Sequence, residues 1–110
     1  MAGKFEIYKS DKNDDYYFRL KAGNGEVVLT SQGYSDKSGA KNGVESVVKN
    51  SGDKGNFECK ESSNGKYFFN LKAKNGQIIG SSQMYKSESG RDNGIDAIGR
   101  AADGAKVEEL

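Results

Sequence analysis

The side chains best suited to chemistry form a Ser-Gln-x-Tyr motif that occurs twice in the chain. Both occurrences fall where a predicted strand ends and a predicted helix begins, beside the positive end of the helix dipole. Hydroxyl and amide groups at such a place can hold a phosphate or a carboxylate, so the motif predicts two related sites for an anion or a nucleotide. Its residues are Ser31, Gln32 and Tyr34 in the first occurrence and Ser82, Gln83 and Tyr85 in the second.

The same motif has a structural explanation that needs no ligand. Serines in the connection, including Ser35 and Ser87, would cap the following helix, while the Gln and Tyr side chains satisfy backbone groups at the turn. A shared fold imposes shared geometry on both copies even where neither binds anything. Agreement between the copies therefore favours the structural interpretation.

A second candidate surface lies on the strands that precede these turns. Aromatic and cationic side chains alternate there with apolar ones, so they project together from one face of each strand. Sheets stack single-stranded nucleic acid on such faces, which makes this ligand an alternative. The formal net charge of +1 weakens it. The side chains are Tyr17, Arg19 and Lys21 in one strand and Phe68, Asn70 and Lys72 in the other.

The usual components of a catalytic or metal site are few. The chain has no histidine, the residue most used for proton transfer near neutral pH and the commonest metal ligand. Cys59, the only cysteine, takes the place that Ile7 has in the first copy, so we expect a buried side chain rather than a reactive thiol. The carboxylate pairs at 14–15 and 108–109 fall in apparent loop or terminal segments. We predict no enzyme activity, no cofactor and no metal site.

An internal repeat determines how these residues are positioned. Shifting the sequence by 51 places lays residues 16–50 over 67–101 without a gap, and 14 of the 35 pairs are identical. One copy of about 50 residues buries too little apolar surface to be stable alone. We therefore predict a single domain, 1–110, in which repeat one (4–52) and repeat two (55–110) share one core about a pseudo-twofold axis.

Each copy predicts three strands followed by a helix of three to four turns. Apolar residues alternate in the strands, and the period becomes helical after Tyr34 and Tyr85. A last strand is predicted at 106–108. The predicted strands are 5–8, 16–22 and 27–29 in the first copy and 57–60, 67–73 and 78–79 in the second. The predicted core is Phe5, Ile7, Phe18, Leu20, Val27, Leu29, Val44, Val47, Phe57, Phe69, Leu71, Ile78, Ile95 and Ile98.

Paired glycines carry two further expectations. The Asn-Gly pairs at 24–25 and 75–76 are typical of type I′ hairpin turns, because both residues tolerate a positive φ. Gly43 and Gly94 recur beside the apolar face of the predicted helices. We expect each helix to lie close to the sheet at that glycine.

The doubled pattern of Leu-Lys-Ala, a two-residue turn, a short strand, Ser-Gln-x-Tyr and a Gly-Val or Gly-Ile helix resembles the YegP-like family of uncharacterised bacterial proteins. The runs 64–73 and 77–85 are especially similar, and the resemblance covers essentially the whole chain. It implies a pair of β(3)-α-β units in one closed or strongly curved sheet, in which the strand after each helix pairs with the other unit. It implies no activity and no catalytic residues.

The combined expectation is an α+β protein, a tandem duplication of a β-β-β-α(-β) unit with one shared antiparallel, curved or barrel-like sheet and two helices. The predicted function is a small non-enzymatic cytosolic binding module, monomeric, with a protein or a single-stranded nucleic acid as partner and no association with a membrane. A single cysteine, and a beginning that resembles no signal peptide, predict the cytoplasm. The alternatives are an anion- or nucleotide-binding protein and an enzyme built from Ser, Tyr, Lys and carboxylates.

Overall fold

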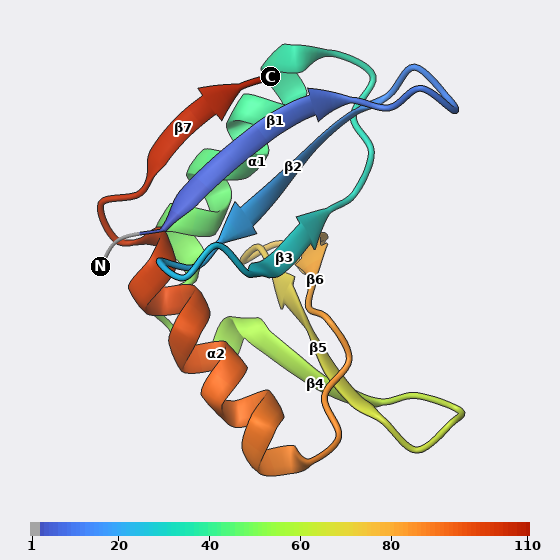
Figure 1. The fold of residues 1–110 in the computed structure, drawn as a ribbon, viewed down its shortest axis with the longest axis vertical. Coiled ribbons are helices and arrows are strands. Elements are labelled where there is room, and N and C mark those ends of the chain that lie inside the picture. The colour runs from blue at the N-terminus through green and yellow to red at the C-terminus, as the bar shows by residue number, and fades with distance from the viewer. Residues whose placement is uncertain (1–2) are drawn as a thin grey trace.

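The chain folds into seven strands and two helices, and the computed structural model describes residues 3–110 (Figure 1). Residues 1 and 2 of the predicted domain lie outside the described part. The first copy forms β1 (Lys4–Lys9), β2 (Tyr16–Lys21), β3 (Val27–Ser31) and α1 (Lys37–Asn50). A short 3-10 helix (Lys54–Asn56) leads into β4 (Phe57–Glu61), β5 (Tyr67–Lys72), β6 (Ile78–Ser81), α2 (Glu88–Ala102) and β7 (Lys106–Glu109).

The strands make one mixed sheet in the order β4-β5-β6-β3-β2-β1-β7. The two copies meet at its centre, where β3 pairs antiparallel with β6 through Thr30 and Ser81. The α+β class and the duplication are confirmed, and the sheet is open, with β4 at one edge and β7 at the other. The expectation of a purely antiparallel sheet is wrong at one pair, because β7 arrives after the α2 crossover and runs parallel to β1.

The two helices are followed by strands that behave differently. The strand after α2 is β7, which pairs with β1 of the other copy, as the family resemblance implies (Figure 1). The strand after α1 is β4, which pairs with β5, the strand that follows it in the chain. Only six residues, 51–56, separate α1 from β4, and they contain no further strand.

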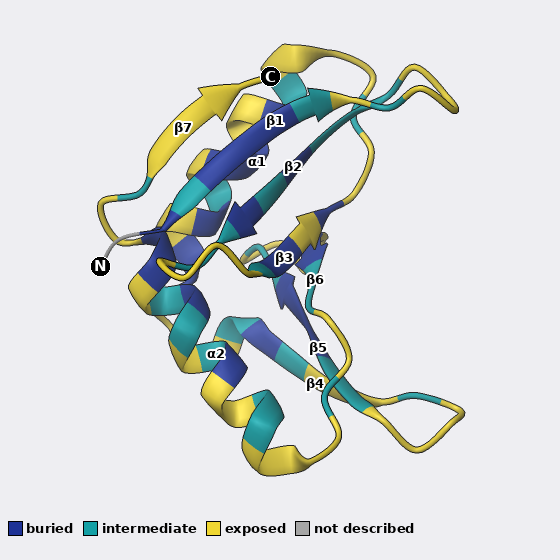
Figure 2. Ribbon diagram, in the orientation of Figure 1, coloured by how far each residue is buried: buried dark blue, intermediate teal, exposed yellow. Residues whose placement is uncertain are grey.

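One cluster of buried side chains joins both copies, with contributions from β1 to β6 and from both helices (Figure 2). Phe5, Phe18, Leu20, Phe69 and Leu71 are fully buried at its centre. Three predicted core residues are not buried: Val27 and Ile95 are intermediate and Ile78 is 40% exposed. Register shifts at Leu20/Lys21 and Leu71/Lys72 explain the exposure of Val27 and Ile78, because they place the neighbouring Val28 and Ile79 in the core instead.

Each helix begins at a side-chain cap. Asp36 caps α1 by accepting from the Gly39 N–H at 2.7 Å, so the expectation that Ser35 does this is wrong. Ser87 caps α2 as expected, accepting from the Gly90 N–H at 3.0 Å. The helix lengths of 14 and 15 residues agree with the predicted three to four turns.

The structure confirms the expectation for the helix glycines and contradicts the one for the hairpin turns. A Cβ on Gly43 would lie 2.5 Å from the Tyr34 Oη and 2.6 Å from Phe18 Cε2, and one on Gly94 would collide with Tyr85, so the close approach of both helices is confirmed. The type I′ turns are wrong, because Gly25 (φ +85°) and Gly76 (φ +86°) have positive φ but the preceding asparagines do not. These turns instead end in a left-handed glycine.

Across residues 3–110, neither helix is long and apolar enough to cross a membrane.

Candidate functional site

The serines of the Ser-Gln-x-Tyr motifs are engaged in the sheet itself. The Ser31 hydroxyl accepts from the Phe18 N–H at 2.9 Å and donates to the Gln32 carbonyl at 2.8 Å. Ser82 repeats this with the Phe69 N–H at 3.0 Å and its own neighbour's carbonyl at 2.8 Å. These hydroxyls replace strand-to-strand hydrogen bonds where β3 and β6 diverge from their neighbours. The geometry therefore supports the structural interpretation.

The tyrosines of the motifs are packing groups. Tyr34 stacks on Phe18 with ring centroids 6.2 Å apart, and Tyr85 stacks on Phe69 at the same separation. Each also forms an isolated β-bridge with the first residue of the adjacent strand. Burial raises the pKa of both phenols. Tyr34 thus packs against α1 at Gly43, and Tyr85 packs against α2 at Gly94.

The glutamines of the motifs are the members that remain exposed. Gln32 lies at the surface, and Gln83 donates from its Nε2 to the Glu26 Oε1 at 3.3 Å, across the junction of the two copies. A role of these turns in binding an anion or a nucleotide stays a prediction.

The predicted aromatic and cationic face exists in the first copy. Tyr17 stacks on Tyr8 with centroids 5.9 Å apart, and the Arg19 guanidinium lies 4.8 Å from the Tyr8 ring centre. Arg19 also donates to Glu6 Oε1 at 2.6 Å. Hydrogen bonds from Arg19, and then from Lys21 and Lys4, lower the pKa of this nearly buried carboxyl to about 2. The cations of this face are therefore paired with Glu6.

The corresponding face of the second copy is different. Phe68 takes the place of Tyr17, and the buried Asn70 takes the place of Arg19 and accepts from the Ser81 hydroxyl at 2.6 Å. Glu58 corresponds to Glu6, with Lys72 at 2.9 Å and Lys60 at 3.4 Å, and the hydrogen bond from Lys72 lowers its pKa. The second copy therefore keeps Phe68 and Lys72 but not the stacked tyrosines and arginine of the first, and binding of single-stranded nucleic acid stays a prediction.

The larger difference between the copies lies at the outer edges of β1 and β4. β1 has β2 on one side and β7 on the other, and the Ile7 carbonyl accepts from the Leu110 N–H at 2.8 Å. β4 has a strand partner on one side only, β5, among the described residues. Ile7 is 1% exposed, whereas Cys59 at the matching position is exposed, so the prediction of a buried Cys59 is wrong. Figure 2 shows the same contrast along the two strands.

The backbone of Cys59 faces this open edge. Cys59 lies opposite Phe69, whose N–H and C=O both engage Ser82 on the other side, at 3.0 and 2.9 Å. Residues opposite each other in an antiparallel pair either exchange both hydrogen bonds or turn both groups away. The Cys59 N–H and C=O therefore point away from β5, as the Ile7 carbonyl points toward β7.

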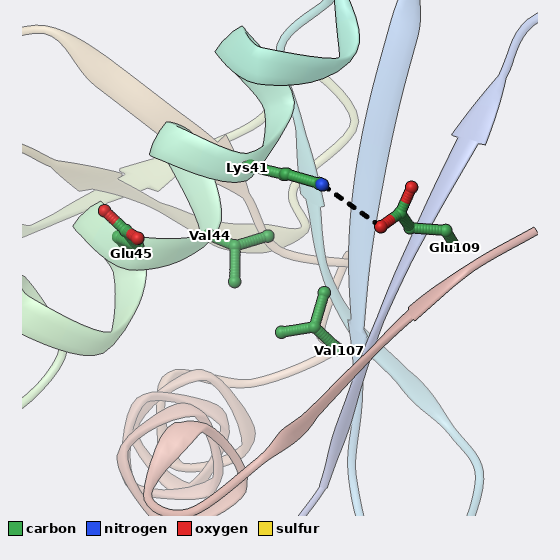
Figure 3. A pocket seen from close by; sticks show the side chains of 5 residues that line it. All are labelled: Lys41, Val44, Glu45, Val107 and Glu109. Atoms are coloured by element: carbon green, nitrogen blue, oxygen red, sulfur yellow. Dashed lines mark ion pairs between the residues drawn. The ribbon is translucent and has the colours of Figure 1, made fainter.

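The covered edge shows how this fold holds an added strand. The Glu109 carboxylate of β7 accepts salt bridges from Lys37 and Lys41 of α1, each at 3.1 Å. Val107 of β7 and Val44 of α1 face each other across a shallow hollow of about 300 Å³ (Figure 3). Glu108 of β7 also pairs with Lys4 at 3.1 Å. Backbone pairing, the approach of Val107 to Val44 and the ion pairs of Glu108 and Glu109 therefore hold β7 in place.

The matching helix positions beside β4 have the opposite charge. Glu88 and Asp92 of α2 stand where α1 has Lys37 and Lys41. Ile95 keeps the apolar character of Val44 but is partly exposed, because no strand covers it. Sequence reasoning missed this edge. The signal available was the short 51–56 connection, which leaves no residues for a strand beside β4.

No group of three His, Cys, Asp or Glu side chains in residues 3–110 is arranged to hold a metal ion.

Comparison with known proteins gives a consistent result. A family described as a domain of unknown function, DUF1508, matches residues 11–58 and again 62–109. A UPF0339 protein from the ptx operon 5′ region of Stutzerimonas stutzeri is 53% identical over 110 residues, covering 100% of this chain and 98% of the relative. UPF0339 protein YegP of Escherichia coli K12 is 52% identical over 98 residues, covering 89% and 88%.

Solved structures match equally well. The solution NMR structure of a UPF0339 protein from Shewanella oneidensis superposes with a TM-score of 0.92 at 49% identity, covering 100% of this chain and 92% of that one. The solution NMR structure of yegP from E. coli, described as a protein of unknown function, has a TM-score of 0.92 at 47% identity, covering 99% and 93%.

Proposed function

The chain belongs to the DUF1508 family, whose function is unknown, and we propose that it is a non-enzymatic interaction module that binds an extended segment of a partner protein along β4. One observation carries the proposal. The two copies share a fold, yet β1 is covered by a parallel strand while the matching edge of β4 is open. Exposed strand edges bind extended peptides by strand addition, in which main-chain hydrogen bonds supply affinity.

The open edge has features that suit it to this role. The Cys59 N–H and C=O are directed outward, and the neighbouring Phe57 N–H already donates to the Lys54 carbonyl. Pairing would therefore begin at the Phe57 carbonyl and continue through Cys59 toward Glu61. The charged side chains of Glu58, Lys60 and Glu61 discourage indiscriminate association at this edge. A bound segment must consequently match the charges beside it.

The remaining chemistry of the chain supports a binding role over an enzyme. The motif serines and tyrosines are committed to packing and backbone hydrogen bonds, and there is no histidine. The lone cysteine agrees with a cytoplasmic location, which is part of the proposal. So is a monomeric state, in which the two copies act as one folding unit.

Single-stranded nucleic acid is a second candidate, favoured by the Tyr8–Tyr17 stack beside Arg19. Bases would have to stack on a pair whose cations already contact Glu6. This candidate predicts salt-sensitive binding of single strands that Tyr17→Ala weakens. Absence of binding at low ionic strength would eliminate it.

The proposed function is tested by selecting random octapeptides on phage against the intact protein. The depletion bait is Cys59→Pro, which removes the outward N–H but no hydrogen bond to β5. Cys59→Val, which keeps the N–H, is the matched control. We expect peptides that bind the parent and Cys59→Val, bind Cys59→Pro at least about tenfold more weakly, and shift the amide signals of Phe57–Glu61.

Selected peptides that bind all three proteins equally, or that shift signals only elsewhere, would overturn the proposal. Circular dichroism of Cys59→Pro checks that the variant is folded, and an unfolded variant is replaced by Glu61→Pro, two residues along the same edge.

A further inference from the structure

We infer that the segment that binds β4 runs parallel to it and carries Lys or Arg at the position where β7 carries Glu109. The inference rests on the proposed function and specifies the chemistry of the partner. It follows from comparing what surrounds β7 in the first copy with what surrounds the open edge in the second.

The orientation comes from β7. β7 runs parallel to β1, with Val107 opposite Phe5 and Glu109 opposite Ile7. The matching residues of β4 are Phe57 and Cys59. A segment in the same register would place its second residue opposite Phe57 and its fourth residue opposite Cys59.

The charge comes from the helix that flanks the edge. Beside β7, Lys37 and Lys41 of α1 outweigh the single carboxylate of Glu45 and together bind Glu109. Beside β4, Glu88 and Asp92 of α2 occupy the matching positions. The helix charges that face the fourth residue of an added strand are therefore positive in the first copy and negative in the second.

Two cations near this edge have partners of their own. Arg91 stands where α1 has Ala40, lies 3.2 Å from the Asp92 carboxylate and covers the Tyr67 ring at 5.8 Å from its centre. Lys54 pairs with Asp96 at 3.2 Å. Arg100, which lines a hollow toward the other end of α2, is about two turns beyond Asp92 along the helix. Within residues 3–110 Glu88 forms no salt bridge, so the end of α2 that carries Glu88 and Asp92 keeps a negative charge that a Lys or Arg at the fourth position of the segment would neutralise.

The second residue of the segment would lie near one partly exposed apolar side chain, Ile95, among polar and charged neighbours that include Lys54, Asp96 and Arg100. In the first copy Val107 faces Val44, which is only 4% exposed. In the second copy a shallow hollow of about 350 Å³ lies over the partly exposed Ile95. An aliphatic side chain there would cover Ile95 as Val107 covers Val44. The preferred pattern is an aliphatic residue, any residue, and then Lys or Arg.

The same charges reject the chain's own C-terminal strand. If β7 of a second copy bound β4 in this register, its Glu109 would face Glu88 and Asp92. Like charges at such a site oppose binding. The occupant is therefore a basic segment of another protein and not a second copy of this chain.

The test uses two acetylated and amidated peptides and the intact protein. One peptide has the sequence Lys-Val-Glu-Glu-Leu of residues 106–110, and the other has Lys in place of the second Glu. Each is titrated into ¹⁵N-labelled protein at low salt while the amide signals of Phe57–Glu61 are followed. We expect the Lys peptide to bind about threefold to tenfold more tightly, as expected for one or two partly exposed ion pairs.

Charge reversal of the helix sharpens the result. The double variant Glu88→Lys, Asp92→Lys should invert the preference, so that the Glu peptide binds more tightly. Asp11→Lys, Asp14→Lys changes the net charge equally at two exposed positions in the loop between β1 and β2 and should leave the preference unchanged. A spin label at the peptide's N-terminus should broaden the signals near Phe57 more than those near Glu61, as a parallel strand requires.

The outcomes separate the two proposals. Equal binding of both peptides at β4, or a preference that the Asp11 and Asp14 control also inverts, would overturn the inference and leave strand addition intact. No shift at Phe57–Glu61 with either these peptides or the selected ones would overturn the proposed function itself. A dimer in sedimentation that Cys59→Pro dissociates would overturn the inference by identifying a second copy as the occupant.

Discussion

β1 and β4 both contain a Phe-Glu pair, at 5–6 and 57–58, and both pair antiparallel with the next strand, but they differ in what lies on their other side. β1 is an interior strand because β7 covers it, and β4 is an edge strand. As a result Phe5, Glu6 and Ile7 are buried, whereas Glu58 is partly exposed and Cys59 is exposed. Two copies of one sequence pattern can thus share a fold although the first strand of one copy is covered by another strand and the first strand of the other is not.

The largest expected effect compares Ile7 with Cys59. Ile7→Ala removes a fully packed side chain and should lower the free energy of unfolding by about 2–4 kcal/mol. Cys59→Ala changes an exposed position and should alter it by less than about 0.5 kcal/mol. Urea unfolding measures both, and similar losses at the two positions would mean that β4 is covered in solution.

The helix glycines should differ less. A Cβ on Gly43 would meet the fully buried Phe18 as well as Tyr34, whereas the three atoms nearest to one on Gly94 all belong to the partly buried Tyr85. We expect Gly43→Ala to destabilise by about 1–3 kcal/mol and Gly94→Ala by less. Gly52→Ala, where a Cβ has nothing within 4 Å, is the control and should be neutral in thermal unfolding.

The acid dependence of stability should come mainly from the first copy. The pKa of Glu6 falls from 4.5 unfolded to about 2 folded, because Arg19 and two lysines stabilise its carboxylate. A lowered folded pKa stabilises the native state above pH 4.5, and this contribution is lost as the pH falls toward 2. Glu6→Gln should therefore destabilise at pH 7, by about 1–3 kcal/mol, and flatten the decline in acid.

Glu58→Gln is the paired measurement. The pKa of Glu58 is also lowered, by Lys72 and Lys60, but its side chain is 38% exposed and solvent screens these pairs. At pH 7 Glu58→Gln should therefore lower the free energy of unfolding less than Glu6→Gln does. A larger loss than that of Glu6→Gln, by urea unfolding at pH 3 and pH 7, would contradict this ranking of the copies.

The smallest effect on stability should come from modifying the open edge. Native Cys59 should react with an alkylating reagent as fast as a free thiol in an unstructured peptide, with a change in unfolding free energy below about 0.5 kcal/mol. Ile7→Cys in a Cys59→Ser background should react only when the protein unfolds. Protection of native Cys59 would indicate that the edge of β4 is already occupied.

Several features follow from local patterns and were predicted correctly. Alternation in 16–22 and 67–73 marks β2 and β5, and helical periodicity after the two tyrosines marks α1 and α2. Gly43 and Gly94 were recognised as close contacts because a glycine that recurs beside an apolar helix face has a packing reason. The Ser-Gln-x-Tyr residues were found as a motif, while the hydrogen bonds that engage Ser31 and Ser82 appear only in the fold.

The failures share a different cause. Val27 and Ile78 were assigned to the core because strict alternation was assumed, and a register shift beside each one moves its neighbour inward. Ser35 was assigned the cap that Asp36 supplies, since helix ends are poorly defined by sequence.

Repetition and periodicity sufficed for the duplicated α+β architecture, because a strand or a helix is specified by residues close together in the chain. Which strand edge is covered depends on residues far apart: β7, at the C-terminus, lies on β1, at the N-terminus. Burial of Ile7 and exposure of Cys59 therefore appear only when the whole chain is assembled, and so does the reversal of charge between Lys37 and Lys41 on one edge and Glu88 and Asp92 on the other.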